Sequence, residues 1–229
     1  MKVLDRRILA GPTPDTARAL LGVRLVRDDP TGRRVARIVE VEAYGGPEDR
    51  ASHARFGSTR RNRVMTGPAG VAYVYLVYGM YDCLNVVTAA EGAPGAVLIR
   101  AVAPLDGIEA MRRARLVVEG RRRAARTPDG LAAAEARTAA TRVERLASGP
   151  GLVSAAFGID TTWTGRDLCD PTSPLRLERD PTDPRDAVDD AAVDVTPRIG
   201  VDYAGLEWAS RPWRFAIVGH ASVSGPRPR

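Results

Sequence analysis

A glutamate and a tyrosine near the end of one predicted strand are the first residues whose types and spacing could do chemistry. Glu42 and Tyr44 lie two residues apart in the β-branched run 35–44, so their side chains point to the same face. A carboxylate there could activate water, and a tyrosine ring could stack on a planar substrate. His53 follows nine residues after Tyr44, in a loop. Ordinary alternatives remain, since an acid on an edge strand usually points to water and a loop histidine can simply bond the backbone.

Four of the six tyrosines belong to one predicted β-hairpin: Tyr73, Tyr75, Tyr78 and Tyr81. The first two share a face and could be ordinary half-buried strand residues. A hairpin turn normally carries Gly, Asn or Asp, but this one carries Tyr78 and Met80 around Gly79. Exposed apolar side chains on a protruding turn indicate a partner, and insertion between base pairs is one known use of such side chains.

The elements that must position these residues are predicted from apolar periodicity and turn residues. Helices are expected over 13–21 and 107–118, and strands over 23–27, 35–44, 71–77, 83–88, 96–101, 199–201 and 213–218. Strand alternation predicts that Glu40 and Glu42 share a face with Ile38. Two segments are predicted to be surface excursions, the Arg/Ala-rich 119–147 and the acidic, proline-rich 170–194. No repeat or clear linker interrupts the chain, so a single domain is expected over 1–229.

Composition excludes several classes of protein. Two cysteines and two histidines are too few for a zinc ribbon, a four-cysteine iron–sulfur cluster or a disulfide framework, so no metal and no cofactor are expected. No apolar run reaches the length of a membrane span, and residues 1–7 hold no signal-peptide core. We therefore expect a cytoplasmic protein that is not secreted. The 34 Lys and Arg against 28 Asp and Glu give a net charge of +6, which suits a polyanionic partner.

An ordered series of motifs resembles the alkyladenine (3-methyladenine) DNA glycosylases. The match extends from about Leu20 to Ser224, so it is far more specific than any single motif. Its pieces are Val39-Glu40-Val41-Glu42-Ala43-Tyr44, Gly46-Pro47-Glu48-Asp49, Ala51-Ser52-His53, Arg61-Asn62, Met65, Tyr73-Val74-Tyr75, Tyr78-Gly79-Met80, Cys83, Asn85, Ala96-Val97-Leu98-Ile99-Arg100-Ala101, Ser148-Gly149-Pro150, Gly165-Arg166-Asp167-Leu168 and Pro197-Arg198-Ile199-Gly200. The segments 152–154 and 219–224 depart from the family's pattern, which affects the far wall of the expected pocket.

The resemblance implies a mixed α/β (α+β) fold, a single domain with a curved antiparallel sheet and a protruding, DNA-inserting β-hairpin. It implies that Glu42 is the general base and that Tyr44, His53 and Tyr75 sandwich a flipped base. It implies that the pocket is lined by Ala51, Ser52, Cys83 and Leu98, that Asn85 discriminates against guanine, and that Arg100 lies beside the pocket. It also implies that Tyr78 fills the gap in the base stack. Contact with the DNA groove is implied for Met80 and Tyr81.

The implied function is base-excision repair by a monofunctional glycosylase that flips alkylated or deaminated purines out of duplex DNA. The resemblance further implies a bacterial-type, nucleoid-associated monomer. Lys2 is the only lysine, which leaves no obvious amine for a Schiff base with the DNA strand. Two alternatives remain open. A non-catalytic nucleic-acid-binding module would gain nothing from Glu42, and a nucleosidase acting on free purine nucleosides would have no base stack for Tyr78 to fill.

Overall fold

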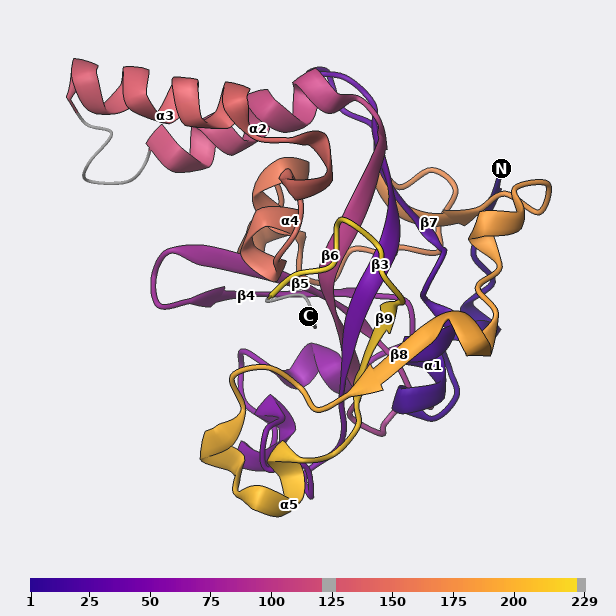
Figure 1. Cartoon of the computed structure of the whole chain (residues 1–229). Helices are drawn as coiled ribbons and strands as arrows, with labels where there is room; N and C mark the ends of the chain where they lie inside the picture. Colours follow the sequence, from indigo (N-terminus) through magenta and orange to yellow (C-terminus); the bar gives the residue numbers. More distant parts are fainter. Residues whose placement is uncertain (121–126, 226–229) are drawn as a thin grey trace.

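A long antiparallel sheet is the frame of the molecule. In the computed structural model, which describes residues 1–120 and 127–225, the strand order is β1-β7-β2-β3-β6-β5-β4, with β9 beside β3 and β8 beside β9. The strands are β1 Lys2–Val3, β2 Arg24–Arg27, β3 Arg34–Tyr44, β4 Ala72–Val77, β5 Tyr81–Val87, β6 Ala96–Asp106, β7 Leu175–Arg179, β8 Val193–Thr196 and β9 Arg214–Ile217. Figure 1 shows the curled sheet, from which the β4–β5 hairpin projects to the left. The described residues therefore form the expected mixed α/β domain.

The helices lie around this sheet. The α-helices are α1 Thr13–Ala19, α2 Ile108–Gly120, α3 Pro128–Ala140, α4 Pro150–Phe157 and α5 Leu206–Ala209. The 3-10 helices are η1 Arg6–Ile8, η2 His53–Phe56, η3 Arg63–Thr66, η5 Val143–Arg145, η6 Thr161–Trp163, η7 Pro184–Asp186, η8 Asp190–Ala192 and η9 Asp202–Ala204. Among the described residues, no helix is long and apolar enough to cross a membrane.

Strand alternation separates an apolar core from the face that will hold the site. On β3 to β6, the core side chains are Val41, Ala43, Ala72, Val74, Leu84, Val86, Val97 and Ile99, which pack with residues of α1, α2 and α4. The intervening positions point to the opposite face because successive side chains of a strand alternate. Burial of the apolar set therefore also determines where the polar set must point.

A double irregularity in β3 and β6 corrects one prediction about the sheet faces. The pairing moves from Ile38 with Val102 to Glu40 with Ala101, and then to Val41 with Ile99. Each step leaves one extra residue, first in β3 and then in β6, as β-bulges do. Ile38 therefore packs in the core with Val41, and it does not share the face of Glu42 as simple alternation predicts.

Two other sequence predictions are wrong in part. The middle of the acidic segment 170–194 is not a surface excursion, because it forms β7 between β1 and β2 with Leu175 and Leu177 fully buried. The segment's charges misled the prediction, since Asp183 and Asp186 pair with the largely buried Arg24 and Arg37. The strand predicted over 199–201 is absent, since these residues lie in a turn. The strand that pairs with β9 on the side away from β3 is β8.

The other excursion, 119–147, contains α3, which packs against α2. Arg112 on α2 donates to the carbonyl oxygens of Thr138 and Ala139, which ties the end of α3 to α2. Figure 1 shows the pair as an arm above the hairpin. Residues 121–126 of this segment lie outside the described residues.

The turn of the β4–β5 hairpin has an uncommon backbone. Tyr78 has φ of 50° and Gly79 has φ of 67°. Positive φ at both central residues is typical of the primed hairpin turns, which match the twist of the strands. For a residue with a side chain, however, this conformation costs about 1–2 kcal/mol. Tyr78 is held in this conformation with 89% of its surface exposed, so it lowers the stability of the turn unless its side chain contacts a partner.

Candidate active site

Three predicted site residues, Asn85, Leu98 and Glu42, form one row with Tyr73 across four neighbouring strands. Tyr73 on β4 pairs with Asn85 on β5, Asn85 pairs with Leu98 on β6, and Leu98 pairs with Glu42 on β3. Tyr75 and Cys83 form the next pair on the same face of the hairpin. All six point away from the apolar core, so the sheet register alone brings together residues up to 56 positions apart, from Glu42 to Leu98.

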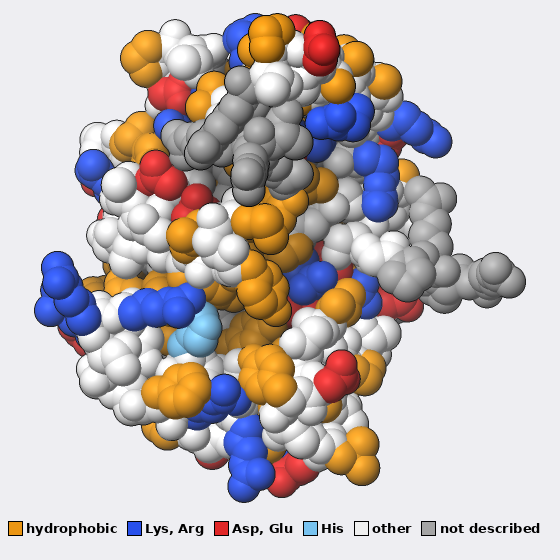
Figure 2. Space-filling view, turned by 90° about the vertical axis from the view of Figure 1, so that its left-hand side faces the viewer, with side chains coloured by type: hydrophobic (Ala, Val, Ile, Leu, Met, Phe, Trp, Pro, Cys, Tyr) orange, Lys and Arg blue, Asp and Glu red, His pale blue; other side chains and the backbone are white. Residues whose placement is uncertain are grey.

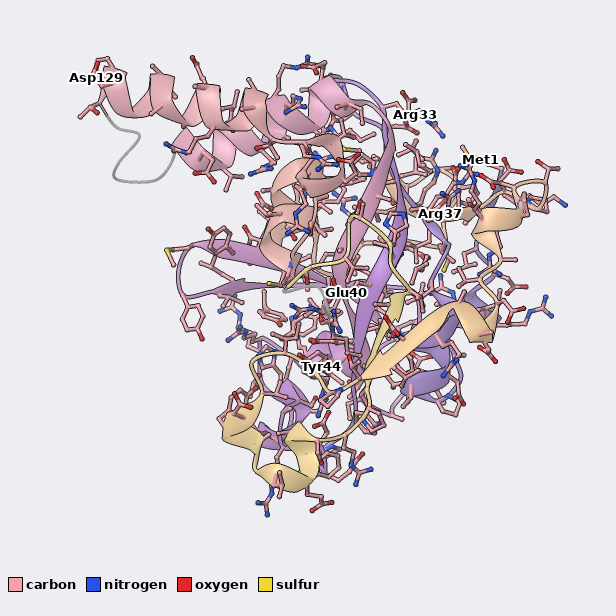
Figure 3. The ribbon with its side chains drawn as sticks, viewed as in Figure 1. Met1, Arg33, Arg37, Glu40, Tyr44 and Asp129 are labelled. Atoms are coloured by element: carbon pink, nitrogen blue, oxygen red, sulfur yellow. The ribbon has the colours of Figure 1, made fainter. Side chains whose placement is uncertain are left out.

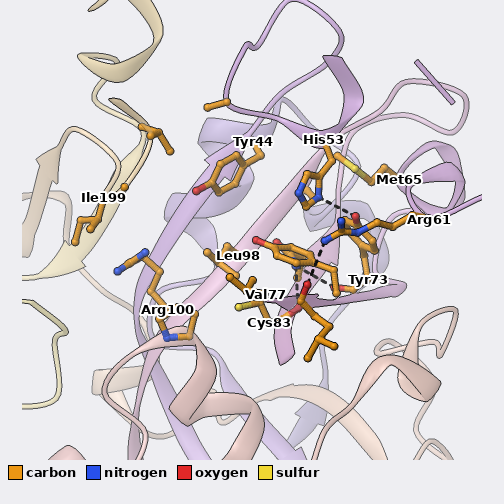
Figure 4. Close-up of a pocket in the computed structure, with 18 of the residues that line it drawn as sticks. Tyr44, His53, Arg61, Met65, Tyr73, Val77, Cys83, Leu98, Arg100 and Ile199 are labelled. Atoms are coloured by element: carbon orange, nitrogen blue, oxygen red, sulfur yellow. Dashed lines mark hydrogen bonds between the residues drawn. The ribbon is translucent and has the colours of Figure 1, made fainter. Parts of the chain in front are cut away.

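These side chains surround an open cavity of about 480 Å³. Figure 4 shows Tyr44 and His53 above the cavity, Arg61 beside Tyr73, and Arg100 and Ile199 at the opposite end. The lining residues are Tyr44, Ala51, His53, Arg61, Met65, Tyr73, Tyr75, Leu76, Val77, Tyr78, Cys83, Asn85, Ala96, Leu98, Arg100, Pro150, Ile199, Gly200, Val201 and Tyr203. The volume and the aromatic lining suit a planar group the size of a nucleobase.

Glu42 lies fully buried behind this wall, and both its carboxylate oxygens are held. Oε1 accepts a hydrogen bond from the backbone N–H of Ile199 at 2.7 Å. Oε2 accepts bonds from the Tyr44 hydroxyl at 2.8 Å and from Nη1 of Arg100 at 3.2 Å. The three donors belong to residues that line the cavity, so the carboxylate lies directly behind the cavity wall. The ordinary alternative, an edge-strand acid pointing to water, is wrong.

The aromatic side chains of the cavity are themselves uncharged at pH 7. Burial, together with Arg61 and Arg55, lowers the pKa of His53 to about 4. Its Nδ1 lies 2.8 Å from the Tyr73 hydroxyl, and its ring packs edge-to-face on Tyr75 with centroids 4.6 Å apart. A neutral imidazole does not repel a cationic purine, while the neighbouring π faces attract one.

Desolvation also keeps the phenol and thiol groups of the cavity protonated. Burial, and next the charge of Glu42, raises the pKa of Tyr44 well above its usual value. Burial raises the pKa of Tyr75 as well, and it raises the pKa of the Cys83 thiol to about 12. Glu42 is therefore the acceptor in this group of residues, and the tyrosines act as donors and stacking surfaces.

The sequence model of the methylpurine-DNA glycosylases (MPG) matches residues 7–221. The chain belongs to this family. A relative from Methanocella arvoryzae, provisionally named a 3-methyladenine DNA glycosylase, is 44% identical over 228 residues, which cover 100% of this chain and 98% of that protein. Human DNA-3-methyladenine glycosylase is 40% identical over 218 residues, 93% of this chain and 65% of the human protein.

Four of the predicted site residues of this methylpurine-DNA glycosylase homologue do not line the cavity: Glu42, which lies behind its wall, and Ser52, Met80 and Tyr81. Ser52 is buried, and its hydroxyl caps η2 by accepting from the N–H of Ala54, so it supports His53 from behind. Met80 lies at the hairpin tip and is 57% exposed. Tyr81 is half-buried at the start of β5, with its ring so close to Gly151 of α4 that a Cβ there would lie 2.7 Å from it.

Three residues of the site receive no role from the sequence: Tyr203, Arg61 and Asn62. Tyr203 lines the cavity mouth and donates to the carbonyl oxygen of Ala51 at 3.2 Å. Arg61 lies 5.2 Å from the ring centroid of Tyr75. Asn62 is buried and donates to the carbonyl oxygens of His53 and Gly57, which shapes the loop that carries the histidine. For Arg61 and Asn62 the motif Arg61-Asn62 was a usable signal, whereas no pattern in the sequence singles out Tyr203.

A buried ion pair joins the two loops that close the site. Arg198 and Asp49 are both fully buried and make two contacts, at 2.6 and 2.9 Å. Arg198 also donates to the carbonyl oxygens of Ala43 and Trp208, and its guanidinium lies 4.9 Å from the ring centroid of Tyr44. This pair places the next residue, Ile199, so that its N–H reaches Glu42.

No group of three or more His, Cys, Asp or Glu residues within 1–120 and 127–225 is arranged to hold a metal ion. Both cysteines are free thiols.

Proposed function

We propose that this chain is a monofunctional DNA glycosylase of base-excision repair. It hydrolyses the N-glycosidic bond of alkylated or deaminated purines, of the 3-methyladenine, hypoxanthine and ethenoadenine class, after the base has flipped out of duplex DNA. The observation that carries the proposal is the sheet row that puts the buried carboxylate of Glu42 behind an aromatic cavity. The name of the human relative, DNA-3-methyladenine glycosylase, agrees with this proposal.

The surface around the cavity suits duplex DNA. Segment 50–63 carries five arginines and no acid, and Arg61 of this segment lines the cavity. Figure 2 shows basic and hydrophobic side chains side by side on the face toward which the hairpin projects. Arginines there would neutralise phosphates, while Tyr78 and Met80 at the exposed tip would enter the base stack. The chain would act as a monomer, since one copy supplies the whole surface.

Each part of the cavity has a task in the proposed reaction. Flipping a base out of the duplex costs a few kcal/mol, and stacking on Tyr44, His53 and Tyr75 offsets part of it. Departure of the base leaves oxocarbenium character on the sugar, which the charge of Glu42 stabilises. Glu42 also accepts the proton of the attacking water as the C–O bond forms and the C–N bond breaks. A cationic alkylated purine leaves as the neutral base with the electron pair of the C–N bond, a neutral purine such as hypoxanthine also takes up a proton from solvent, and the sugar keeps the new hydroxyl.

The proposal is tested with a duplex that contains one hypoxanthine, with free inosine as a parallel substrate. The expected products are free hypoxanthine and a strand that stays intact until alkali cleaves it at the abasic site. Lys2 lies on β1, at the other end of the strand order from β4, so borohydride should trap no covalent complex. Hydrolysis of inosine alone would indicate a nucleosidase. Binding of the duplex without release of base would indicate a non-catalytic module.

Tyr78 is expected to fill the gap that a flipped base leaves. Tyr78→Ala should weaken the flipped complex by about 1–3 kcal/mol, the usual value of one base–aromatic stack. The side chain is 89% exposed, so the fold should be unaffected. The measurement is the fluorescence of a 2-aminopurine placed beside the lesion. Equal flipping by the variant and the parent protein would show that another residue is the wedge.

Asn85 is expected to exclude guanine. Its Nδ2 donates to the carbonyl oxygens of Tyr73 and Cys83 at 3.0 and 3.1 Å, so the buried amide is fixed at the cavity wall. A 2-amino group pressed against it would clash or lose its hydrogen bond, at a cost of about 1–3 kcal/mol. Asn85→Ser should raise excision of 7-methylguanine relative to hypoxanthine. The measurement is the ratio of single-turnover rates, and an unchanged ratio would assign the exclusion to another part of the wall.

A further inference from the structure

Glu40 is a second fully buried carboxylate beside Glu42, and the proposed reaction does not use it. Its Oε1 accepts hydrogen bonds from Nε of Arg100 at 3.0 Å and from Nε of Arg214 at 2.7 Å. Its Oε2 accepts the backbone N–H of Ser224 at 2.6 Å. Figure 3 shows Glu40 midway along β3, between Arg37 and Tyr44.

The two bulges bring Glu40 and Arg100 together. The register shifts on both sides of Glu40 leave Val39 as the extra residue of β3 and Arg100 as the extra residue of β6, one on each side of the pair of Glu40 with Ala101. The backbone holds this irregularity, because the N–H of Gly149 donates to the carbonyl oxygen of Arg100 at 3.0 Å. Bulges beside active sites commonly redirect a side chain, and here the redirected side chain is the arginine that contacts Glu42.

Arg100 divides its guanidinium between two carboxylates. Nε contacts Glu40 at 3.0 Å, whereas only Nη1 contacts Glu42, at 3.2 Å. An arginine fork that is free to turn prefers two parallel bonds to one carboxylate. Such a clamp would put two charged donors on Glu42 in place of one and oppose its protonation more strongly, so an arginine held elsewhere leaves Glu42 a better base.

The charges of this cluster balance. Glu40 and Glu42 carry two negative charges, and Arg100 and Arg214 carry two positive charges, with all four side chains at most 14% exposed. Buried ions are tolerated when they are paired in this way. Removal of any one of them therefore changes the net charge that Glu42 experiences.

We propose that Glu40 is a positioning residue for the glycosylase reaction. It holds Arg100 through Nε, so that the guanidinium reaches Glu42 with one nitrogen only and Glu42 remains able to take a proton from water. The inference rests on the proposed function, because it assigns a role within that reaction.

The other groups facing Glu42 do not change charge in the neutral range. They are Tyr44 on β3, Tyr75 on β4 and Cys83 on β5, and burial raises the pKa of each of them. The remaining contact is the uncharged N–H of Ile199. His53, with a pKa of about 4, lies in the same cavity, so it is the difference between the acid limbs of two variants with the same His53 that isolates the charges of Glu40 and Arg214.

Glu40→Gln is the first test, with the whole protein and a hypoxanthine duplex. Loss of the negative charge leaves Arg100 free to close on Glu42, so the single-turnover rate should fall by about 10- to 100-fold, the scale of a misplaced catalytic geometry. The acid limb should move to lower pH, because a removed negative neighbour favours ionised Glu42. The Kd for the lesion duplex, measured by fluorescence anisotropy, should stay within about threefold of the parent value.

Arg214→Gln is the matched variant, since it removes the other partner of the same Glu40 oxygen. It removes a positive charge, so its acid limb should move to higher pH, opposite to that of Glu40→Gln. Damage to the fold would not give opposite shifts. Shifts in the same direction, or unchanged rate and profile in Glu40→Gln, would overturn the positioning role while the proposed function stands. A parent protein that releases no base would overturn both.

Discussion

Glu42→Gln is expected to abolish most of the excision of damaged bases while the protein still binds the lesion duplex. The rate should fall by about 10²-fold or more, because an amide can neither accept the proton of the attacking water nor stabilise the charge on the sugar. Binding should persist, since the aromatic cavity and the hairpin tip are unchanged and Glu42 itself is fully buried. The measurement pairs single-turnover excision of hypoxanthine with the Kd for the same duplex.

A second substitution separates charge from position. Glu42→Asp keeps the carboxylate but withdraws it from the N–H of Ile199 and the hydroxyl of Tyr44. It should therefore retain more activity than Glu42→Gln and less than the parent protein. Excision by Glu42→Gln within a few-fold of the parent rate would refute the assignment of the base.

Which residues of a strand share a face with the site could be predicted within β3 near Glu42 and within the hairpin, because alternation and turn length are local rules. The spacing of Glu42 and Tyr44, the alternation in 71–77 and the short turn before Cys83 are readable in the sequence and hold in the structure. The pairing of these strands is not readable from spacing alone. The register that places Asn85 opposite Leu98, and Leu98 opposite Glu42, is set by contacts between distant segments.

The errors have physical causes of the same kind. The bulge at Val39 reverses the face of Ile38, and no residue type marks a bulge in a run of β-branched residues. Segment 170–194 looks like solvated loop because of its acids, but its Asp186 is 1% exposed and pairs with Arg24 and Arg37. Composition predicts that an acidic side chain lies in water, because an unpaired charge is costly to bury. Whether it is buried depends on a partner of opposite charge that can be far away in the sequence.

The pair of Arg198 and Asp49 gives the second large expected effect. Arg198→Gln would leave the fully buried Asp49 carboxylate without its cation, and such a change costs about 3–5 kcal/mol of unfolding free energy. For a chain of 229 residues this corresponds to a fall in Tm of roughly 6 to 20 °C. Excision should also slow, because Ile199 would no longer be held with its N–H on Glu42.

Thermal unfolding and single-turnover excision measure the two effects separately. Arg211→Gln is the matched control, because Arg211 is 38% exposed and pairs with the exposed Glu207, and such surface pairs contribute about 0–1 kcal/mol. The double variant Asp49→Asn with Arg198→Gln removes both charges and should recover part of the lost stability, since an unpaired buried ion is the main cost. If Arg198→Gln unfolded at the temperature of Arg211→Gln, the buried pair could not be what joins the two loops over Glu42.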